Sequence, residues 1–417
     1  MKYWQWARKF PSYCILVGLI LSQICFVKHC FAQKFTFNGP QKREGMDFKF
    51  IKNLIVIPLY INSKGPFNFI LDTGVGSLIV TDPTLIDSLK LSDLKTTKLY
   101  GLGEGQEIEA FRSNQINIQI KGAHIEKIPA AILKEDIFDL SNYLGIKIYG
   151  LIGYHFFNSF VVKINYISNR LTYALPEAGV RKKGEKFQLV LENNRPYIFA
   201  DVETSDQQNV KVKLIVDCGA SHALSMDALD GKAFPLPKDT ISANLGVGLS
   251  GIISGSMGRI PKLTLGKFVF KDMLSGFPAF ESLASKIGYN QQNGNLGAEF
   301  LKRFQVIFDY QNSALYLKPN QEYGKPFEHD MSGIEVYGDP KNKRHIFIGR
   351  IERDSPAEKA GFLEQDEIMS INLKLIEDYT LEEVGKLFKS QDGRTILIEI
   401  VRDKKNIIKL LKLKRRI

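Results

Sequence analysis

The strongest constraint on the fold of this chain is an internal repeat with a nearly constant offset. Residues 69–74 (FILDTG) resemble residues 214–219 (LIVDCG), which lie 145 positions later. Three further pairs of segments keep this offset to within one residue: 101–103 with 246–248, 153–160 with 297–304, and 165–173 with 309–317. Because an offset that persists through separate segments is typical of a duplicated unit, we interpret the chain as two related lobes, 45–180 and 181–320.

The local sequence pattern within each lobe is typical of β-structure. Residues 55–61 and 67–71 are short apolar runs separated by N-S-K-G-P, which is the pattern of a β-hairpin. Residues 211–216 show a similar alternation in the second lobe. The chain has 417 residues, of which 44% are hydrophobic, and this is enough for two or three domains with their own cores. We therefore expect a mainly β fold with duplicated lobes and a separate C-terminal domain.

The first 32 residues have the three-part layout of a secretory signal peptide. A short basic segment, 1–10, precedes an apolar run over 15–27, and small residues stand at positions 30 and 32. The apolar run is shorter than the roughly 20 residues that a transmembrane helix needs. We expect cleavage after residue 32 and an exported protein, periplasmic or extracellular, without a stable membrane span. The alternative is an uncleaved signal that anchors the chain in the membrane.

The cysteines indicate that the mature protein has no internal disulfide. Cys14, Cys25 and Cys30 lie in the segment that we expect to be removed, so only Cys218 remains. A disulfide within the chain would need a second cysteine. The stability of the mature protein must therefore come from its apolar cores.

The net charge of +11 does not indicate a nucleic-acid-binding protein. The leader carries four basic and no acidic residues, so its removal leaves +7, spread along the chain apart from the basic residues at 412–416. Basic and aromatic residues are not interleaved as in proteins that bind single strands. The histidines lack metal-ligand spacing, and the GVGLSG stretch at 246–251 lacks the context of a dinucleotide site and is better interpreted as a hairpin. We expect no nucleic acid, no metal and no cofactor.

Asp72 and Asp217 are the candidate catalytic residues. Each follows three apolar residues and precedes a small residue and a glycine, so each lies where a strand enters a tight turn. A single aspartate of this kind most often caps a turn, but two lobes related by a pseudo-twofold axis bring equivalent turns together. Two adjacent carboxyl groups share a proton; one can then act as a base for water and the other as an acid for a carbonyl. The pair predicts peptide hydrolysis.

The two motifs DTGVGS (72–77) and DCGAS (217–221) resemble the active-site motifs of aspartic proteases, and GLIG (150–153) and GNLG (294–297) are similar to the apolar-apolar-glycine segment of each lobe in that family. The resemblance is nearest to retropepsin-like bacterial members, and it implies acid-protease β-barrel lobes and polypeptide substrates. It also implies three groups of site residues: Asp72 and Asp217 as catalytic residues, Thr73, Gly74, Cys218 and Gly219 as active-site support, and Gly101, Gly103, Gly246 and Gly248 in glycine-rich flaps over the substrate cleft.

Cys218 departs from the family pattern. The family has a threonine or serine after the aspartate, and its hydroxyl group bonds to the backbone of the other lobe. Because a thiol is a weak donor, we expect this interlock to be weaker on one side. Two functions stay open: an active endopeptidase, or a catalytically silent peptide-binding protein that uses the same cleft. The thiol could also be a redox-sensitive switch or a nucleophile.

The third position after each aspartate bears on the pH dependence. Family members with acidic optima tend to carry serine or threonine there, whereas this chain has Val75 and Ala220, which donate no hydrogen bond. Fewer bonds to the ionised form make a carboxyl group less acidic. We therefore expect an optimum nearer to neutrality.

The last part of the chain resembles a PDZ domain. Residues 321–332 have the composition of a linker, and the segments SPAEKAG (355–361) and QDEIMSIN (365–372) resemble a bacterial PDZ signature. The resemblance implies an α+β domain over 333–417 that binds C-terminal peptide ligands and holds their carboxylate in backbone N–H groups. By position, this loop consists of Ser332, Gly333 and Ile334. The alternative is a PDZ fold with only a structural or dimerising role.

Overall fold

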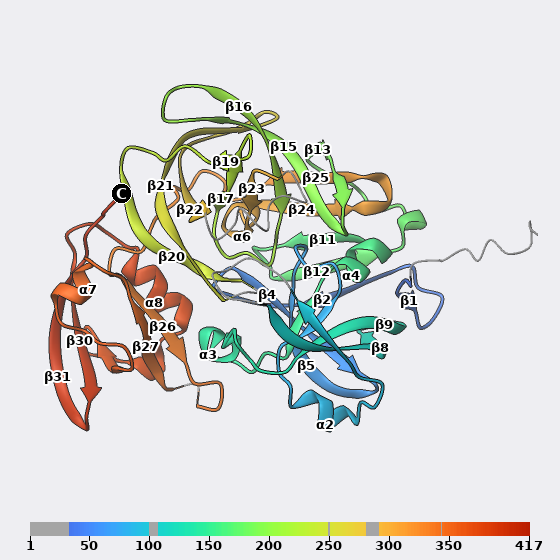
Figure 1. The fold of residues 1–417 in the computed structure, drawn as a ribbon, viewed down its shortest axis with the longest axis horizontal. Helices are drawn as coiled ribbons and strands as arrows, with labels where there is room; N and C mark the ends of the chain where they lie inside the picture. Colours follow the sequence, from blue (N-terminus) through green and yellow to red (C-terminus); the bar gives the residue numbers. More distant parts are fainter. Residues whose placement is uncertain (1–32, 100–106, 249–250, 281–291, 343) are drawn as a thin grey trace, which may run out of the picture. The chain divides into compact units, whose positions relative to one another are not determined.

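The computed structural model describes residues 33–99, 107–248, 251–280, 292–342 and 344–417, and these residues form a mainly β protein of five sheets (Figure 1). The mainly β class predicted from the sequence is confirmed, and the C-terminal part adds the α+β domain. The signal-peptide prediction lies outside the described residues and stays a prediction. None of the helices in the described part of the chain has the length and apolar character needed to span a membrane.

Most strands of the predicted first lobe lie in a nine-stranded sheet. Its order along the sheet is β1 (Thr36–Phe37), β9 (Ala123–Leu133), β6 (Leu78–Val80), β10 (Gly150–Ile152), β5 (Lys64–Leu71), β4 (Leu54–Ile61), β8 (Ile108–Ile120) and β7 (Lys95–Leu99), and β3 (Lys49–Ile51) pairs with β4. The helices of this part are α2 (Leu85–Leu89), α3 (Leu140–Leu144) and α4 (Tyr154–Ser159).

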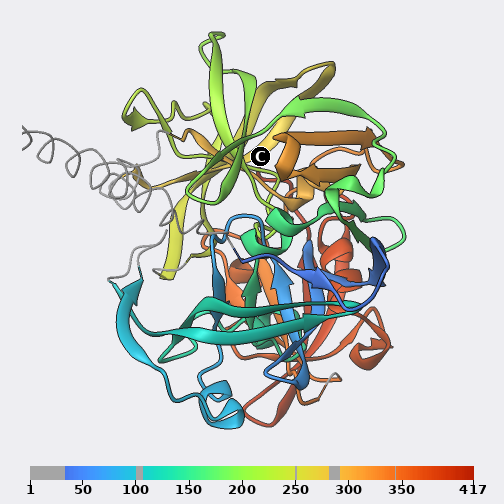
Figure 2. The same ribbon diagram turned by 90° about the vertical axis from the view of Figure 1, so that its right-hand side faces the viewer.

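The second lobe is an eight-stranded sheet. Its order is β14 (Val190–Glu192), β15 (Arg195–Glu203), β16 (Asn209–Val216), β23 (Gly294–Leu296), β17 (Leu224–Met226), β22 (Phe268–Pro278), β21 (Gly251–Leu265) and β20 (Thr240–Gly248). The described residues of this part also form a small hairpin, β18 (Ala228–Leu229) with β19 (Lys232–Ala233), and helix α6 (Ala298–Leu301). The strands of the nine-stranded sheet are blue to teal, and those of the eight-stranded sheet are mostly green to yellow (Figures 1 and 2).

The two sheets have matching strand pairings. β5 pairs in parallel with β10 as β16 pairs with β23, and β6 pairs with β9 and β10 as β17 pairs with β22 and β23. A six-stranded sheet contains strands from both halves of the repeat, in the order β13 (Glu185–Gln188), β25 (Ala314–Pro319), β24 (Phe304–Asp309), β11 (Val161–Asn165), β12 (Arg170–Ala174) and β2 (Arg43–Asp47). Short 3₁₀ turns lie at Pro176–Ala178 and Tyr310–Asn312. Most buried apolar residues of these three sheets form one large core, and a smaller cluster contains Leu54, Val56 and Ile70 of β4 and β5 with Leu144 and Ile148.

The C-terminal domain has a six-stranded sheet and a core of its own. Its strands are β26 (Ile334–Gly338), β27 (Ile346–Ile351), β28 (Glu367–Ile371), β29 (Lys374–Leu375), β30 (Thr395–Arg402) and β31 (Lys405–Lys412). Its helices are α7 (Pro356–Lys359) and α8 (Leu381–Phe388), with a 3₁₀ turn at Ile376–Asp378. Each α-helix begins after a side-chain cap: Ser355 accepts from the N–H of Glu358, and Thr380 forms a capping box with Glu383.

The segment predicted as a linker, 321–332, is packed against the rest of the chain. The guanidinium group of Arg303 is buried, donates to the carbonyl oxygens of Glu322 and Pro326 at 3.1 Å each, and lies 3.7 Å from the centre of the Phe327 ring. Phe327 belongs to the core of the lobes, whereas Met331 belongs to the core of the C-terminal domain. The segment is therefore not a free tether, although its polar composition resembles one.

Candidate active site

Asp72 and Asp217 occupy equivalent places, each directly after a buried strand. Asp72 follows β5, which pairs in parallel with β10, and its N–H donates to the carbonyl oxygen of Ile152 at 2.9 Å. Asp217 follows β16, which pairs in parallel with β23, and its N–H donates to the carbonyl oxygen of Leu296 at 2.9 Å. The same pairing therefore determines where both aspartates leave their strands.

The two carboxyl groups lie against the turns of the opposite motifs. Asp72 accepts a hydrogen bond from the N–H of Gly74 at 2.7 Å, and Asp217 accepts one from the N–H of Gly219 at 2.8 Å. A Cβ atom on Gly219 would lie 2.1 Å from Cγ of Asp72, and one on Gly74 would lie 2.7 Å from Oδ2 of Asp217. Each carboxyl group thus occupies space that a side chain on the opposite glycine would need, so the structure brings the two aspartates together.

The surroundings of the pair favour a shared proton. Asp72 is only 7% exposed. Burial, the charge of Asp217 and a hydrogen bond with Asp217 raise the pKa of Asp72 well above its ordinary value, and the Gly74 N–H and the charge of Arg195 oppose this only in part. One carboxyl group of the pair is therefore protonated at a pH at which an exposed aspartate is ionised.

Thr73 and Cys218 connect the two motifs in both directions. The hydroxyl group of Thr73 donates to the carbonyl oxygen of Val216 at 2.7 Å and accepts from the N–H of Cys218 at 2.9 Å. The thiol of Cys218 donates to the carbonyl oxygen of Leu71 at 3.2 Å. Sγ of Cys218 therefore takes the place that mirrors the Thr73 hydroxyl group, and the interlock has a donor on each side, one of them the weaker thiol.

The environment of Cys218 argues against a reactive thiol. The residue is fully buried, and burial together with the charge of Asp72 raises the pKa of the thiol. Because the thiolate is the nucleophilic and readily oxidised form, a thiol that stays protonated and has no solvent access is inert. The geometry thus favours a structural role for Cys218 over the redox and nucleophile alternatives.

We expect Cys218→Ser to keep or raise both turnover and thermal stability and to leave the shape of the pH profile unchanged. A hydroxyl group is a better donor to the Leu71 carbonyl, and a neutral hydrogen bond contributes about 0.5–1.5 kcal/mol net. Cys218→Thr is the comparison, because its extra methyl group enters a fully buried site and can cancel the gain. Thermal unfolding and peptide turnover measure both effects. Complete loss of hydrolysis in a folded Cys218→Ser protein would assign the function to the thiol.

The predicted flap glycines are described in part. Gly101 and Gly103 lie outside the described residues. Gly246 and Gly248 lie in β20, near the end of the long hairpin with β21, and Gly246 adopts φ +135° beside a β-bulge. That backbone conformation is favoured by glycine. The structure therefore places these two residues in a glycine-containing hairpin, and their role over a substrate stays a prediction.

The predicted PDZ loop is occupied by a carboxylate of the same chain. The N–H groups of Ser332 and Gly333 donate to Oδ1 of Asp330 at 2.9 and 2.8 Å, and the N–H of Ile334 donates to Oγ of Ser332 at 2.9 Å. Burial raises the pKa of Asp330 to about 6, and the bonds from Ser332 and Gly333 oppose this shift. All three predicted donors are therefore engaged, so a peptide carboxylate must displace Asp330, which the sequence alone did not indicate.

We expect the full-length chain to bind a peptide with a free C-terminal carboxylate only weakly at pH 7.5, and Asp330→Ala to bind it at least about tenfold more tightly. Removal of the internal carboxylate frees two N–H donors and removes a negative charge that repels the carboxylate of the peptide. Together these two effects are expected to strengthen binding by more than the 1.4 kcal/mol that corresponds to a tenfold change in affinity. Fluorescence anisotropy measures the affinity, with the C-terminally amidated peptide as the control. Tight carboxylate-dependent binding by the unmodified chain would show that Asp330 does not block the loop.

Comparison with known families fits this geometry. Residues 57–156, which contain Asp72, match the family model described as aspartyl protease, and residues 347–402 match the PDZ domain model. The chain carries an aspartyl protease domain and a PDZ domain. No curated protein matches the chain. Asp217 lies beyond the matched part of the aspartyl protease domain, so its assignment rests on the repeat and on the contacts described above.

Sequence reasoning missed two polar residues that contact the aspartate motifs. Asn295 donates from Nδ2 to Oδ2 of Asp217 at 2.8 Å, and Arg195 donates from Nε to the carbonyl oxygen of Gly74 at 2.9 Å. The sequence did contain a signal for Asn295, because it is a polar residue in the otherwise apolar GNLG segment. Arg195 had no such signal, because it lies 121 positions from Gly74 in the sequence.

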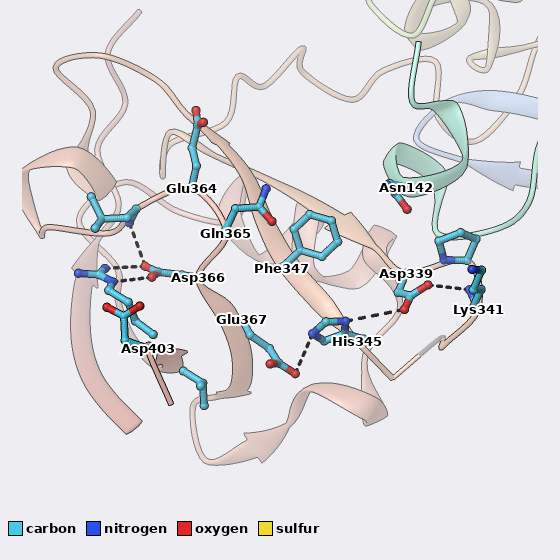
Figure 3. Close-up of a pocket in the computed structure, with 14 residues that line it drawn as sticks. Asn142, Asp339, Lys341, His345, Phe347, Glu364, Gln365, Asp366, Glu367 and Asp403 are labelled. Carbon is cyan, nitrogen blue, oxygen red and sulfur yellow. Dashed lines mark hydrogen bonds and ion pairs between the residues drawn. The ribbon is translucent and has the colours of Figure 1, made fainter. Parts of the chain in front are cut away.

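A hollow of about 810 Å³ lies over the PDZ domain and away from the aspartates (Figure 3). Its lining includes the ion pair of Asp366 with Arg402, at 2.6 Å, and the contact of Nε2 of His345 with Glu367, at 2.9 Å. No residue of either aspartate motif lines it. Because these polar groups already pair with one another, we assign it no ligand.

Proposed function

We propose that the chain is an exported aspartic endopeptidase that hydrolyses peptide bonds with a water molecule activated between Asp72 and Asp217. The observation that carries the proposal is the arrangement of two carboxyl groups, each lodged against the glycine of the opposite motif, with the pKa of Asp72 raised by burial and by Asp217. The aspartyl protease domain supports the reaction class. Export, to the periplasm or the cell exterior, is proposed from the N-terminal segment.

The proposed reaction needs one ionised and one protonated carboxyl group. The carboxylate takes a proton from water as the oxygen attacks the carbonyl carbon, and the carboxylic acid gives its proton to the carbonyl oxygen. The first group then protonates the leaving nitrogen, and the second recovers a proton as the carbonyl re-forms. The Thr73 and Cys218 bonds across the lobes hold the two groups at a fixed separation, which such a proton exchange requires.

Cleavage of a peptide library, combined with inhibitor binding, tests the proposal against a catalytically silent peptide-binding protein. An active pair binds a statine-type inhibitor at least about 10²-fold more tightly than the matched peptide, because the inhibitor resembles the transition state. A silent binding protein has similar affinity for both and releases no products. Equal affinity together with uncleaved peptides would therefore favour the second function.

We expect the pH optimum of peptide hydrolysis to lie nearer to neutrality than the pKa of an ordinary aspartate. Asp72 must keep its proton for the reaction, and its raised pKa means that the proton is lost only at a pH above that of an ordinary aspartate. The basic limb of kcat/KM is therefore displaced upward, and activity persists as the pH rises until Asp72 ionises. Rates measured from pH 3 to 9 on one peptide test this. A maximum below about pH 4, near the value of an unperturbed carboxyl group, would contradict it.

We propose that the PDZ domain engages protein substrates or partners and takes no part in the chemistry. Its peptide ligands follow from the domain type, while Asp330 restricts access to its carboxylate loop. A structural role is the alternative, and the Asp330→Ala measurement above distinguishes the two.

A further inference from the structure

Asn295 lies beside the aspartate pair, at a position that is apolar in the first lobe. In β23 it is paired with the residue two positions before Asp217. In β10 the residue paired two positions before Asp72 is Leu151. The two strand registers are therefore the same, and Asn295 and Leu151 are structural counterparts that differ in a single property, the presence of a side-chain amide.

The Asn295 amide makes the two carboxyl groups unequal. Its Nδ2 donates to Oδ2 of Asp217 at 2.8 Å, while Oδ1 of Asp217 accepts from the N–H of Gly219 at 2.8 Å. Both oxygens of Asp217 thus have a donor from the second lobe. Leu151 can donate nothing to Asp72, and among the described residues of the first lobe only the N–H of Gly74 donates to that carboxyl group. Hydrogen bonds donated to a carboxylate stabilise its ionised form.

The orientation of the Asn295 amide follows from its partner. An ionised carboxylate offers only acceptors, so the NH₂ group must face Asp217 and the carbonyl oxygen must point away from it. That oxygen and Nε2 of His222 are both buried, and neither makes a hydrogen bond of good geometry with another described residue. Burial lowers the pKa of His222, and Asp217 and the Asn295 side chain oppose this shift. His222 is thus neutral at physiological pH, so it provides no positive charge beside Asp217.

The other groups that face the pair do not reverse this asymmetry. Burial raises the pKa of Tyr310 and of the Cys218 thiol, so both stay uncharged. The charge of Arg195 favours ionisation of Asp72, but its effect is smaller than that of burial and of Asp217. Burial and the charge of Asp217 thus favour the proton on Asp72, opposite a carboxyl group that accepts two hydrogen bonds from its own lobe.

We propose that Asn295 is a positioning residue that sets the two roles, so that Asp217 is the carboxylate that deprotonates the attacking water and Asp72 is the acid that protonates the carbonyl oxygen. The inference rests on the proposed function and deepens it. Water gives its proton to Asp217 as the C–O bond forms, and Asp72 gives its proton to the carbonyl oxygen. When the C–N bond breaks, Asp217 protonates the nitrogen, and Asp72 regains a proton from the hydroxyl group.

The test reads the protonation of the pair without requiring turnover. In the full-length chain with ¹³C-labelled aspartate carboxyl groups, assigned with Asp72→Asn and Asp217→Asn, NMR follows each carboxyl group through a pH titration. We expect the first ionisation of the pair to occur on Asp217. In Asn295→Leu this step moves upward by about one pH unit, because a hydrogen bond to a charged group is lost. Where hydrolysis is measured, the acid limb of kcat/KM moves by the same amount.

Reciprocal variants separate this role from a structural one. Leu151→Asn in the Asn295→Leu background moves the donor to the other lobe, so the first ionisation is expected to shift to Asp72. Asn295→Ala serves as a second donor-free variant if the leucine form fails to fold, as judged by thermal unfolding. An unchanged first ionisation in a folded donor-free variant, or first ionisation on Asp72 in the unmodified chain, overturns the inference. Absence of hydrolysis with the expected titration would overturn only the proposed function.

Discussion

Asp72→Asn and Asp217→Asn are each expected to lose nearly all peptide hydrolysis, by about 10²-fold or more. Either change removes the shared proton, since an amide is neither a carboxylate base nor a carboxylic acid. Because the two residues act as one unit, the double variant is expected to lose little more than either single variant. Initial rates on one peptide, measured with all three variants and the unmodified chain, test this.

Two controls define the result for the aspartates. Circular dichroism and thermal unfolding must show a folded protein, since Asp72 lies in the core of the site. Asp330→Asn, a change of the same kind in the PDZ domain, is expected to leave hydrolysis of a short peptide unchanged. If either Asp72→Asn or Asp217→Asn retained more than about a tenth of the activity, the dyad assignment would be wrong, because losses from such groups are usually larger.

Gly219→Ala is expected to abolish hydrolysis and to lower thermal stability. The new Cβ atom would lie 2.1 Å from Cγ and 2.4 Å from both carboxyl oxygens of Asp72, which is closer than non-bonded atoms can approach. Either Asp72 leaves its place or the turn of the second motif shifts, and overpacking of this kind typically costs about 1–3 kcal/mol. Thermal unfolding and peptide turnover measure the two effects separately.

Two other glycines provide graded comparisons for Gly219→Ala. Gly74→Ala makes the mirror-image contact at a longer 2.7 Å, to Oδ2 of Asp217, so its loss of activity is expected to be smaller. Gly385, in α8, has open space at its Cβ position. Gly385→Ala is expected to leave activity unchanged and to stabilise the chain by about 0.5–1 kcal/mol through helix propensity. A fully active Gly219→Ala protein would contradict the close approach of the two motifs.

The sequence was sufficient for the features that depend on short-range pattern. Apolar runs that end in Asp-x-Gly predicted where β5 and β16 stop, and the constant offset related the two motifs before any contact was known. Asp72 and Asp217 could be nominated because the same local signal occurs twice. The PDZ signature at 355–372 was equally local, since it combines a capped helix with a strand.

Tertiary structure alone decided which side chains meet. Asn295 reaches Asp217 across 78 positions, Arg195 reaches Gly74 across 121, and Arg303 contacts the segment that resembled a linker. Asp330 was close in sequence to the PDZ loop, yet its side chain could equally have faced solvent. Local pattern acts over a few residues, whereas strand register and burial determine the partners of a side chain and the protonation of a carboxyl group. The two candidate aspartates therefore followed from the sequence, whereas the polar residues that contact their motifs followed only from the fold.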